Sequence, residues 1–531
     1  MTKQFSYAMP YGAPRRPVLA RNMVATSQPL AAQAGLSMLA RGGNAVDAAL
    51  AAAATLTVVE PTGNGLGSDA FAIVWDGKTL HGLNASGRSP AAWTPERFAG
   101  RDRMPARGWE SVTVPGAVSA WADLSEKFGA LEFATLLEPA INYARDGFAV
   151  SPTIAELWEK GGALLADQPG FAETFLPNGR APRAGETFRN PALADSLLAI
   201  AESKGEAFYR GELAARIADF AALHGAALTR EDLAAHRNDW CGTISMDYAG
   251  VQLHEIPPNG QGIVALIALG ILEHLPLSAF GPDSAQSLHY QIEAIKLAMA
   301  DVERYVSDPA YMDVPVEALL DKDYLKRRAQ FIEAGRAQIF GAGAPLAGGT
   351  VYITAADASG MMVSYIQSNY SGFGSGVAVP GTGIHLQNRG SGFTLEEGHP
   401  NRVGPRKRPF HTIIPGFLMR DGKPLMSFGV MGGPMQAQGH VQMVLRTQLY
   451  GQNPQAASDA PRWRFISGRD VAVEWTMDIS TVAGLEALGH NVTRESPDTS
   501  FAFGGAQLIH RLEDGYIGGS DHRKDGMAVG F

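Results

Sequence analysis

Cysteine and charge are both scarce in this sequence. The 531 residues include one cysteine, Cys241, which excludes an intrachain disulfide and any metal cluster built from cysteines alone. Lone cysteines usually pack as small apolar residues, so we expect Cys241 to be buried or half-buried. Only 18% of the residues are charged and 45% are hydrophobic, a composition that excludes a disordered chain or a coiled coil and favours a large core.

Positive charge and long apolar runs are also lacking. The formal net charge is −9, which disfavours binding to nucleic acid or to an anionic membrane. The longest apolar run, Ala45 to Val59, contains Asp47 and is too short and too rich in alanine to span a bilayer. The first residues contain no apolar stretch of signal-peptide length. We therefore expect a soluble, cytoplasmic protein with no nucleic-acid and no membrane partner.

Several common catalytic motifs are missing. The sequence has no GxxxxGK(S/T) phosphate-binding loop, no GxSxG nucleophile turn, and no HExxH pair or HxH cluster among its 13 histidines. The run Gly63-Asn-Gly-Leu-Gly67 lacks the full dinucleotide-binding spacing and precedes a predicted strand instead of following one, so we interpret it as a plain loop. We expect no metal and no cofactor.

Helical patterns dominate the first part of the chain and strand patterns the last. Apolar spacing and capping residues predict helices over 30–41, 45–59, 118–128, 192–203 and 284–305. Strands are predicted over 70–75, 79–84, 350–355, 361–367, 412–419 and 424–430. The small-residue stretch from Gly341 to Gly349 has neither period, so we expect it to be a flexible, exposed connection.

Thr350 opens a predicted strand directly after the pair Gly348-Gly349. If the bond between Gly349 and Thr350 were cut, the new α-amine could act as the base for the threonine hydroxyl, which is a weak nucleophile on its own. The alternative is an ordinary loop followed by a β-branched residue that begins a strand. The local pattern alone favours this alternative.

A second glycine pair, Gly432-Gly433, follows the predicted strand 424–430. Glycine lets backbone amides point freely at a ligand, as an oxyanion hole requires. An ordinary turn at the end of a strand would explain the pair equally well.

Fragments spread over some 500 residues give the chain a resemblance to the γ-glutamyltranspeptidase family of N-terminal-nucleophile hydrolases. Each fragment is short, but their order along the chain is specific. The fragments are Met23-Val-Ala-Thr-Ser-Gln-Pro29, Gly42-Gly-Asn-Ala-Val-Asp-Ala-Ala49, Val114-Pro-Gly-Ala117, Ala144-Arg-Asp-Gly-Phe148, Ala207-Phe-Tyr-Arg-Gly211, Pro257-Pro-Asn-Gly-Gln-Gly262, Phe373-Gly-Ser-Gly376, Lys407-Arg-Pro409, Gly432-Gly433, Ala460-Pro-Arg462 and Gly519-Ser-Asp521.

The resemblance implies an α+β fold, a four-layer αββα sandwich made as one precursor. It implies cleavage between Gly349 and Thr350, giving a large subunit of residues 1–349 and a small subunit of residues 350–531. Thr350 corresponds to the family's nucleophile, Ser368 to the hydroxyl that supports it, and Gly432 and Gly433 to the oxyanion-hole glycines. The two local interpretations thus converge on one mechanism, in which Thr350 attacks an amide carbonyl and water resolves the acyl-enzyme.

The chain departs from the glutamyl-specific members of this family at several substrate-binding positions. The arginine that binds the α-carboxylate in those enzymes corresponds to Ser86, with Arg88 two residues further on. An asparagine that helps with the carboxylate corresponds to Tyr370, and a pair of serines to His411-Thr412. The segment 397–404 is short, so we expect the lid loop of some relatives to be absent.

Two further replacements change the charge of the expected site. The glutamine and aspartate that bind the substrate's α-ammonium in glutamyl-specific enzymes correspond to Arg389 and Gly392. A guanidinium there would repel an ammonium and attract a carboxylate. The hypothesis is a substrate amide whose acyl part carries a carboxylate but no α-amine. The alternative is that Arg389 pairs with a protein acid such as Glu396.

Among relatives that lack these γ-glutamyl-binding residues, the chain most resembles the oxamate amidohydrolase branch, which hydrolyses oxamate to oxalate and ammonia in purine catabolism. A glutaryl or cephalosporin-type acylase and a γ-glutamyl hydrolase or transpeptidase are the alternatives. A hypothesis from another class is an unprocessed, catalytically silent scaffold. The expected partners are a small-molecule amide and the two subunits themselves, and the sequence leaves open whether they assemble into a dimer of heterodimers.

Overall fold

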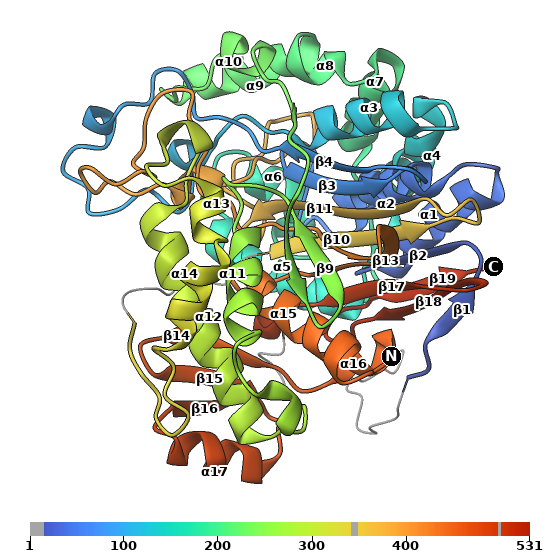
Figure 1. The fold of residues 1–531 in the computed structure, drawn as a ribbon. Helices are drawn as coiled ribbons and strands as arrows, with labels where there is room; N and C mark the ends of the chain where they lie inside the picture. The colour runs from blue at the N-terminus through green and yellow to red at the C-terminus, as the bar shows by residue number, and fades with distance from the viewer. Residues whose placement is uncertain (1–14, 341–348, 497–500) are drawn as a thin grey trace, which may run out of the picture.

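Two seven-stranded sheets, packed face to face, form the centre of the protein (Figure 1). The computed structural model describes residues 15–340, 349–496 and 501–531. The first sheet has the order β19-β2-β10-β11-β3-β4-β7. Its strands are β19 (Met527–Gly530), β2 (Met23–Thr26), β10 (Gly349–Ala356), β11 (Met362–Tyr370), β3 (Asp69–Trp75), β4 (Leu80–Ala85) and β7 (Asp239–Trp240).

The second sheet has the order β1-β18-β17-β13-β12-β9-β8, and all its neighbouring strands are antiparallel. Its strands are β1 (Val18–Ala20), β18 (Gly515–Ser520), β17 (Ala506–Leu512), β13 (Lys423–Val430), β12 (Gly416–Arg420), β9 (Val251–Glu255) and β8 (Ile244–Tyr248). Apolar side chains of both sheets, among them Phe71, Tyr352 and Phe417, form the core between the sheets.

Helices cover the outer face of each sheet, so the molecule has four layers. The helices over the first sheet are α1 (Pro29–Ala40), α2 (Ala45–Val59), α3 (Ala117–Phe128), α4 (Phe133–Asp146) and α7 (Pro191–Ser203). Those over the second sheet are α11 (Gly262–Leu272), α12 (Ala285–Tyr305), α15 (Met435–Val444) and α16 (Pro454–Asp459). The expected αββα sandwich is confirmed.

The remaining elements lie around these layers. They are α5 (Pro152–Leu165), α6 (Phe171–Phe175), α8 (Glu206–Tyr209), α9 (Glu212–Leu223), α10 (Arg230–Ala234), α13 (Val316–Leu319), α14 (Lys322–Ala329) and α17 (Ile479–Ala487), a small sheet of β14 (Trp463–Ser467), β15 (Asp470–Glu474) and β16 (Asn491–Glu495), and the pair β5 (Phe148–Ala149) and β6 (Thr187–Phe188). Within the described ranges, no helix combines the length and the hydrophobicity needed to cross a membrane.

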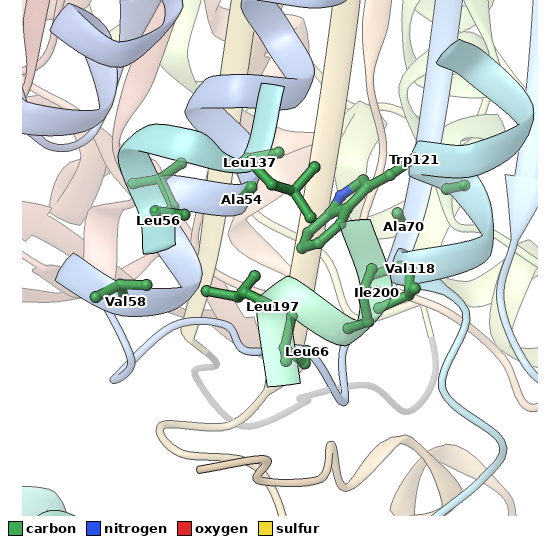
Figure 2. Packing of buried hydrophobic residues seen from close by; sticks show 14 of the residues in the cluster. Ala54, Leu56, Val58, Leu66, Ala70, Val118, Trp121, Leu137, Leu197 and Ile200 are labelled. Atoms are coloured by element: carbon green, nitrogen blue, oxygen red, sulfur yellow. The ribbon is translucent and has the colours of Figure 1, made fainter. Parts of the chain in front are cut away.

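Helix α2 shows how sequence and packing agree at the first sheet. Its Asn44 side chain accepts from the N–H of Asp47, and the Asp47 carboxylate accepts from the N–H of Asn44, which closes a capping box. The acid that interrupts the apolar run is therefore a cap. The helix is otherwise small and apolar and buried on all sides, and Figure 2 shows Ala54 and Leu56 in the same core as Trp121.

Two local predictions need correction. The strand predicted over 412–419 begins only at Gly416, because Pro415 has no N–H to donate and residues 412–414 turn toward the site described below. Cys241 is exposed, since it lies just after the two-residue edge strand β7. The predicted flexible connection falls largely on residues 341–348, which lie outside the described residues.

Candidate active site

Thr350 is the second residue of β10, a strand with neighbours on both sides in the first sheet. Its register with β11 is irregular between Gly349 and Val351, and the residue is buried, with 1% of its surface exposed. The Thr350 Oγ1 atom lies 3.1 Å from Ser368 Oγ on β11, and Gln436 Nε2 of α15 donates to it at 3.4 Å. The predicted nucleophile and its supporting hydroxyl are therefore in contact.

The glycine-rich loop 63–67 packs directly against this strand start. A Cβ on Gly63 would lie 3.5 Å from Thr350 N, and a Cβ on Gly65 would lie 2.3 Å from the ring of His385. A side chain at Gly65 could not be accommodated without moving the imidazole, which is held by Asn369 and by the carbonyl of Pro61. The loop therefore has a positional role beside Thr350 that the interpretation as a plain loop did not include.

The glycine pair lies between β13 and α15, close to the Thr350 side chain. Gly432 has φ 115° and Gly433 has φ 59°, values that glycine adopts without strain. No acceptor in the described part of the chain takes a hydrogen bond from the N–H of either glycine. The amides precede the N-terminus of α15, whose dipole favours negative charge, and Gln261 Nε2 donates to Gly433 O at 2.9 Å. This arrangement can hold an oxyanion.

Arg389 is fully buried beside Tyr370 and Thr412. Its Nη1 donates to Thr412 Oγ1 at 2.8 Å, and its guanidinium carbon lies 4.2 Å from the centre of the Tyr370 ring. The Nε and Nη2 atoms have no hydrogen-bond partner among the described residues. Burial lowers the pKa of Arg389 to about 10, although Tyr370 and Asp69 oppose this shift. The guanidinium stays charged at neutral pH, with one edge free.

The alternative partner for Arg389 is not in contact with it. Glu396 is exposed and contributes to the wall of a neighbouring cavity, and within the described ranges Arg389 forms no ion pair with a carboxylate. Arg88 differs, because its Nη1 lies 3.2 Å from Asp308 Oδ2 and its Nη2 lies 3.8 Å from Asp239 Oδ2. The charge of Arg88 is thus already matched by protein acids.

His411 and Asp69 form a buried pair behind Arg389. The N–H of Ile413 donates to His411 Nδ1 at 3.3 Å, so we assign the ring proton to Nε2, which lies 3.1 Å from Asp69 Oδ2. Burial, together with Arg389, holds the pKa of His411 well below its usual value. Burial raises the pKa of Asp69 to about 7 against the opposing charge of Arg389. His411 is therefore neutral and orients the network.

Tyr370 connects Ser368 to Arg389. Its N–H donates to Ser368 Oγ at 2.8 Å while its ring covers one face of the Arg389 guanidinium. The residue has φ 79°, a left-handed conformation that costs a non-glycine residue about 1–3 kcal/mol and that clusters at functional sites. Tyr370 also contributes to the wall of the neighbouring cavity.

A cavity of about 570 Å³ adjoins these residues. Among the residues that line it are Gln261, Tyr370, Thr412, Gly392 and Pro434. The rest of the lining mixes apolar side chains with polar and charged ones, among them Val264, Met299, Val302, Val306, Phe410, Arg103, Glu303, Glu396 and His399. This volume is within the range of pockets that hold drug-sized ligands.

Three residues of the site escaped the sequence analysis. Gln261 joins the carbonyls of Thr412 and Gly433, Gln436 contacts the Thr350 hydroxyl, and Asp69 accepts from the N–H groups of Gly87 and Gly116. Asp69 could have been noticed, because it is an acid that directly precedes an apolar strand. Gln261 lies in the fragment Pro257–Gly262 that carries the family resemblance, although no role was predicted for it, and nothing in the sequence marks Gln436.

We expect Ser368→Ala to slow both self-cleavage and substrate turnover by about 10²-fold, because Thr350 Oγ1 would lose its hydroxyl partner in a buried site. Ser368→Thr should keep most of both activities, since it retains the hydroxyl. Electrophoresis after timed incubation and initial rates of amide hydrolysis measure the two effects. Normal rates in the alanine variant would contradict the assigned contact.

The four-layer sandwich, in which Thr350 and Ser368 meet where β10 begins, has the architecture of the N-terminal-nucleophile hydrolases. A sequence model described as Gamma-glutamyltranspeptidase matches residues 31–531. The chain belongs to this family.

Similar proteins carry several different functional names. The chain is 40% identical to a glutathione hydrolase-like YwrD proenzyme of Bacillus subtilis, with 96% of this chain and 98% of that protein covered. It is 37% identical to an oxamate amidohydrolase proenzyme of Klebsiella pneumoniae, with 97% and 99% covered. A crystal structure of a cephalosporin acylase from Bacillus halodurans is 48% identical and superposes with a TM-score of 0.94, with 100% and 99% covered. Two of these three are named as proenzymes.

Proposed function

We propose that this chain is a self-cleaving amidohydrolase whose nucleophile is Thr350 and whose substrates are amides with a carboxylate on the acyl part. The observation that carries the proposal is the free edge of Arg389. Its Nη1 is used by Thr412 and one of its faces by Tyr370, which leaves Nε and Nη2 together on one side. These two N–H groups form the fork that binds a carboxylate through two parallel hydrogen bonds.

The proposed self-cleavage uses the same hydroxyl as catalysis. Thr350 Oγ1 attacks the carbonyl carbon of Gly349, and the C–N bond of the peptide breaks as the nitrogen takes a proton and becomes the Thr350 amine. Water then hydrolyses the ester, leaving a carboxylate at Gly349 and restoring the hydroxyl. Gly349 and Thr350 are consecutive in β10, so the bond lies within reach of Ser368 and Gln436.

Substrate hydrolysis repeats these steps on an external amide. The Thr350 amine accepts the hydroxyl proton as Oγ1 attacks, and the amides of Gly432 and Gly433 stabilise the oxyanion. The proton then passes to the departing amine, and water releases the acid. Ser368 orients the hydroxyl, and Tyr370, His411 and Thr412 hold Arg389 in place.

Oxamate is the smallest substrate that fits this charge pattern, because its amide adjoins a carboxylate and it has no ammonium. It is our first assignment, with oxalate and ammonia as the products. The cavity supports a second candidate, a glutaryl-type acylase, because its volume exceeds what oxamate needs and leaves room for a larger amine. A γ-glutamyl donor is disfavoured, since its ammonium would meet the unpaired charge of Arg389.

Three substrates separate these candidates in one experiment. Glutaryl and γ-glutamyl p-nitroanilides share chain length and leaving group and differ only in the α-amine, and oxamate tests the smallest case by ammonia release. We expect activity on oxamate or the glutaryl anilide to exceed activity on the γ-glutamyl anilide by at least about tenfold. Strong γ-glutamyl turnover alone would refute the role of Arg389.

Arg389→Met should lower kcat/KM for the preferred acid amide by about 10²- to 10³-fold, since a buried charged hydrogen bond to the carboxylate is lost. Arg88→Met is the matched control. It removes another arginine, one whose charge is already paired with Asp308, so we expect less than about a threefold change. Initial rates of both variants measure the difference, and equal losses would show that Arg389 is not the carboxylate ligand.

A further inference from the structure

The start of β10 has a neighbouring strand on one side only. β11 accompanies it from Gly349 onward, but β2 pairs with it no earlier than Ile353, opposite Thr26. Thr26 is the last residue of β2, and β19 pairs with it through Met527. Ser27 follows the end of β2, and the segment 524–526 precedes the start of β19. Both therefore lie toward the end of the sheet where β10 begins without a β2 partner.

Glu60 is buried beside this open side. It follows the last residue of α2, and its carboxylate accepts from Ser27 Oγ at 2.5 Å. Its backbone carbonyl accepts from the N–H of Gly63, the glycine whose added Cβ would lie 3.5 Å from Thr350 N. Glu60 is thus one tight turn away from the backbone of the proposed nucleophile.

Lys524 approaches the same place from the other end of the chain. Its buried Nζ has no hydrogen-bond partner in the described part of the chain and lies 3.1 Å from the centre of the Phe501 ring. Its stem packs on Gly505, whose added Cβ would lie 2.7 Å from Lys524 Cγ. The carbonyl of Gly505 accepts from the N–H of Met431, the residue before the glycine pair. Lys524 therefore lies between the proposed oxyanion hole and Glu60.

The charges around this lysine are incompletely matched. Glu60 faces Lys524 from the end of α2, Asp521 and Asp525 lie on the lysine's own segment, and Arg462 faces it from the turn before β14. Asp521 is already bound by Arg462 and Arg523, and Asp525 accepts from Thr153. Burial raises the pKa of Glu60 and lowers that of Lys524, and each group opposes the shift of the other.

The side chains that hydrogen-bond to Thr350 Oγ1 among the described residues carry no charge. Ser368 approaches from β11 and Gln436 from α15. The glycine loop 63–67 contributes backbone beside the Thr350 nitrogen. On the β11 side, the buried charges are those of Asp69, which pairs with Ser368 in the sheet, and of Arg389, which lies on the Tyr370 ring. On the open side they are those of Glu60 and Lys524, with the side chains that face them.

We propose that Lys524 and Glu60 are positioning residues that set the protonation state of the α-amine Thr350 gains on cleavage, with Lys524 favouring its neutral form. This inference rests on the proposed role of Thr350 as nucleophile. An ordinary α-amine is about half protonated near pH 8 and must be neutral to accept the hydroxyl proton. A buried ammonium nearby makes a second positive charge unfavourable, and the Glu60 carboxylate limits this effect.

The test is the pH profile of kcat/KM for the processed enzyme and three variants. Lys524→Met removes a positive charge, so the Thr350 α-amine should hold its proton more tightly. The acidic limb of the kcat/KM profile should then move to higher pH by about one unit, which is a roughly tenfold loss of kcat/KM on that limb. Glu60→Gln removes a negative charge and should move the same limb down. Lys524→Arg keeps the charge and should leave the limb in place.

The possible results separate this inference from the proposed function. A wild-type chain that stays uncut, or whose small fragment does not begin at Thr350, overturns the proposed function itself. A cut, active enzyme whose acidic limb stays in place in both charge-removing variants overturns only the role of the pair. If Lys524→Met does not mature, Glu60→Gln decides the question, because an unmoved or upward limb in that variant contradicts the inference.

Discussion

Thr350→Ala is expected to remain one chain of 56.3 kDa and to show no amide hydrolysis above background. The substitution removes the Oγ1 atom that contacts Ser368 and Gln436, so neither the Gly349 carbonyl nor an external amide has a nucleophile. Losing a covalent nucleophile costs on the order of 10⁴-fold or more in kcat, because only binding and oxyanion stabilisation remain. Electrophoresis and a rate assay on the same sample measure both effects.

Thr350→Ser is the matched control for that experiment. It keeps a hydroxyl at the same position and removes only a methyl group, so cleavage and turnover should persist at reduced rates. The wild-type protein should show two fragments, beginning at the original N-terminus and at Thr350. A wild-type chain that stays intact and inactive would instead favour the scaffold hypothesis raised from the sequence. Full activity in the alanine variant would assign the nucleophile elsewhere.

Asp521→Asn is expected to cost about 3–5 kcal/mol of stability, because it removes the carboxylate paired with the buried guanidinium of Arg462 and one of the two paired with that of Arg523. Asp521 lies 2.5 Å from Arg462 and 3.0 Å from Arg523, and it also accepts from the N–H of Ala506. All three charged side chains are buried, and Glu474 is the other acid that binds Arg523. Thermal unfolding followed by scanning calorimetry, with the soluble yield, measures the loss.

Asp313→Asn is the control for this stability experiment, since Asp313 pairs with Arg304 at 3.7 Å on the surface and exposed pairs contribute about 0–1 kcal/mol. Similar unfolding temperatures for the two variants would contradict the importance of the buried network. The network also predicts acid sensitivity. Burial would raise the pKa of Asp521, but Arg462 and Arg523 hold it well below its usual value. Its stabilising contribution is therefore complete above about pH 4 and is lost as the pH falls further.

The sequence was most informative where local pattern and packing agree. The bounds of α2 were predicted to the residue, because Asn44 caps a run that is small and apolar on every side. The contact between Thr350 and Ser368 followed from the family resemblance, and strand pairing of β10 with β11 brings the two together. Gln436 and Gln261 were not predicted, because their roles depend on how α15 and α11 approach the sheets.

Arg389 shows the limit of charge arguments from sequence. Its positive charge suggested a carboxylate ligand, but the residue types left an ion pair with Glu396 open as the alternative. Burial of the guanidinium, the Tyr370 ring on its face and the bond to Thr412 exist only in the folded chain. These three contacts, and not the charge, leave one defined edge available for a ligand.

The strand order of the first sheet has a consequence for how the mature protein would recover from unfolding. β10 and β11 lie between β2 and β3, so residues on both sides of the proposed cut alternate within one sheet. Before cleavage, refolding is a unimolecular search. After it, the two fragments must find each other, and the rate depends on their concentration. After cleavage, the lifetime of the folded protein would therefore be set by its unfolding barrier, because two separated fragments refold less readily than one chain.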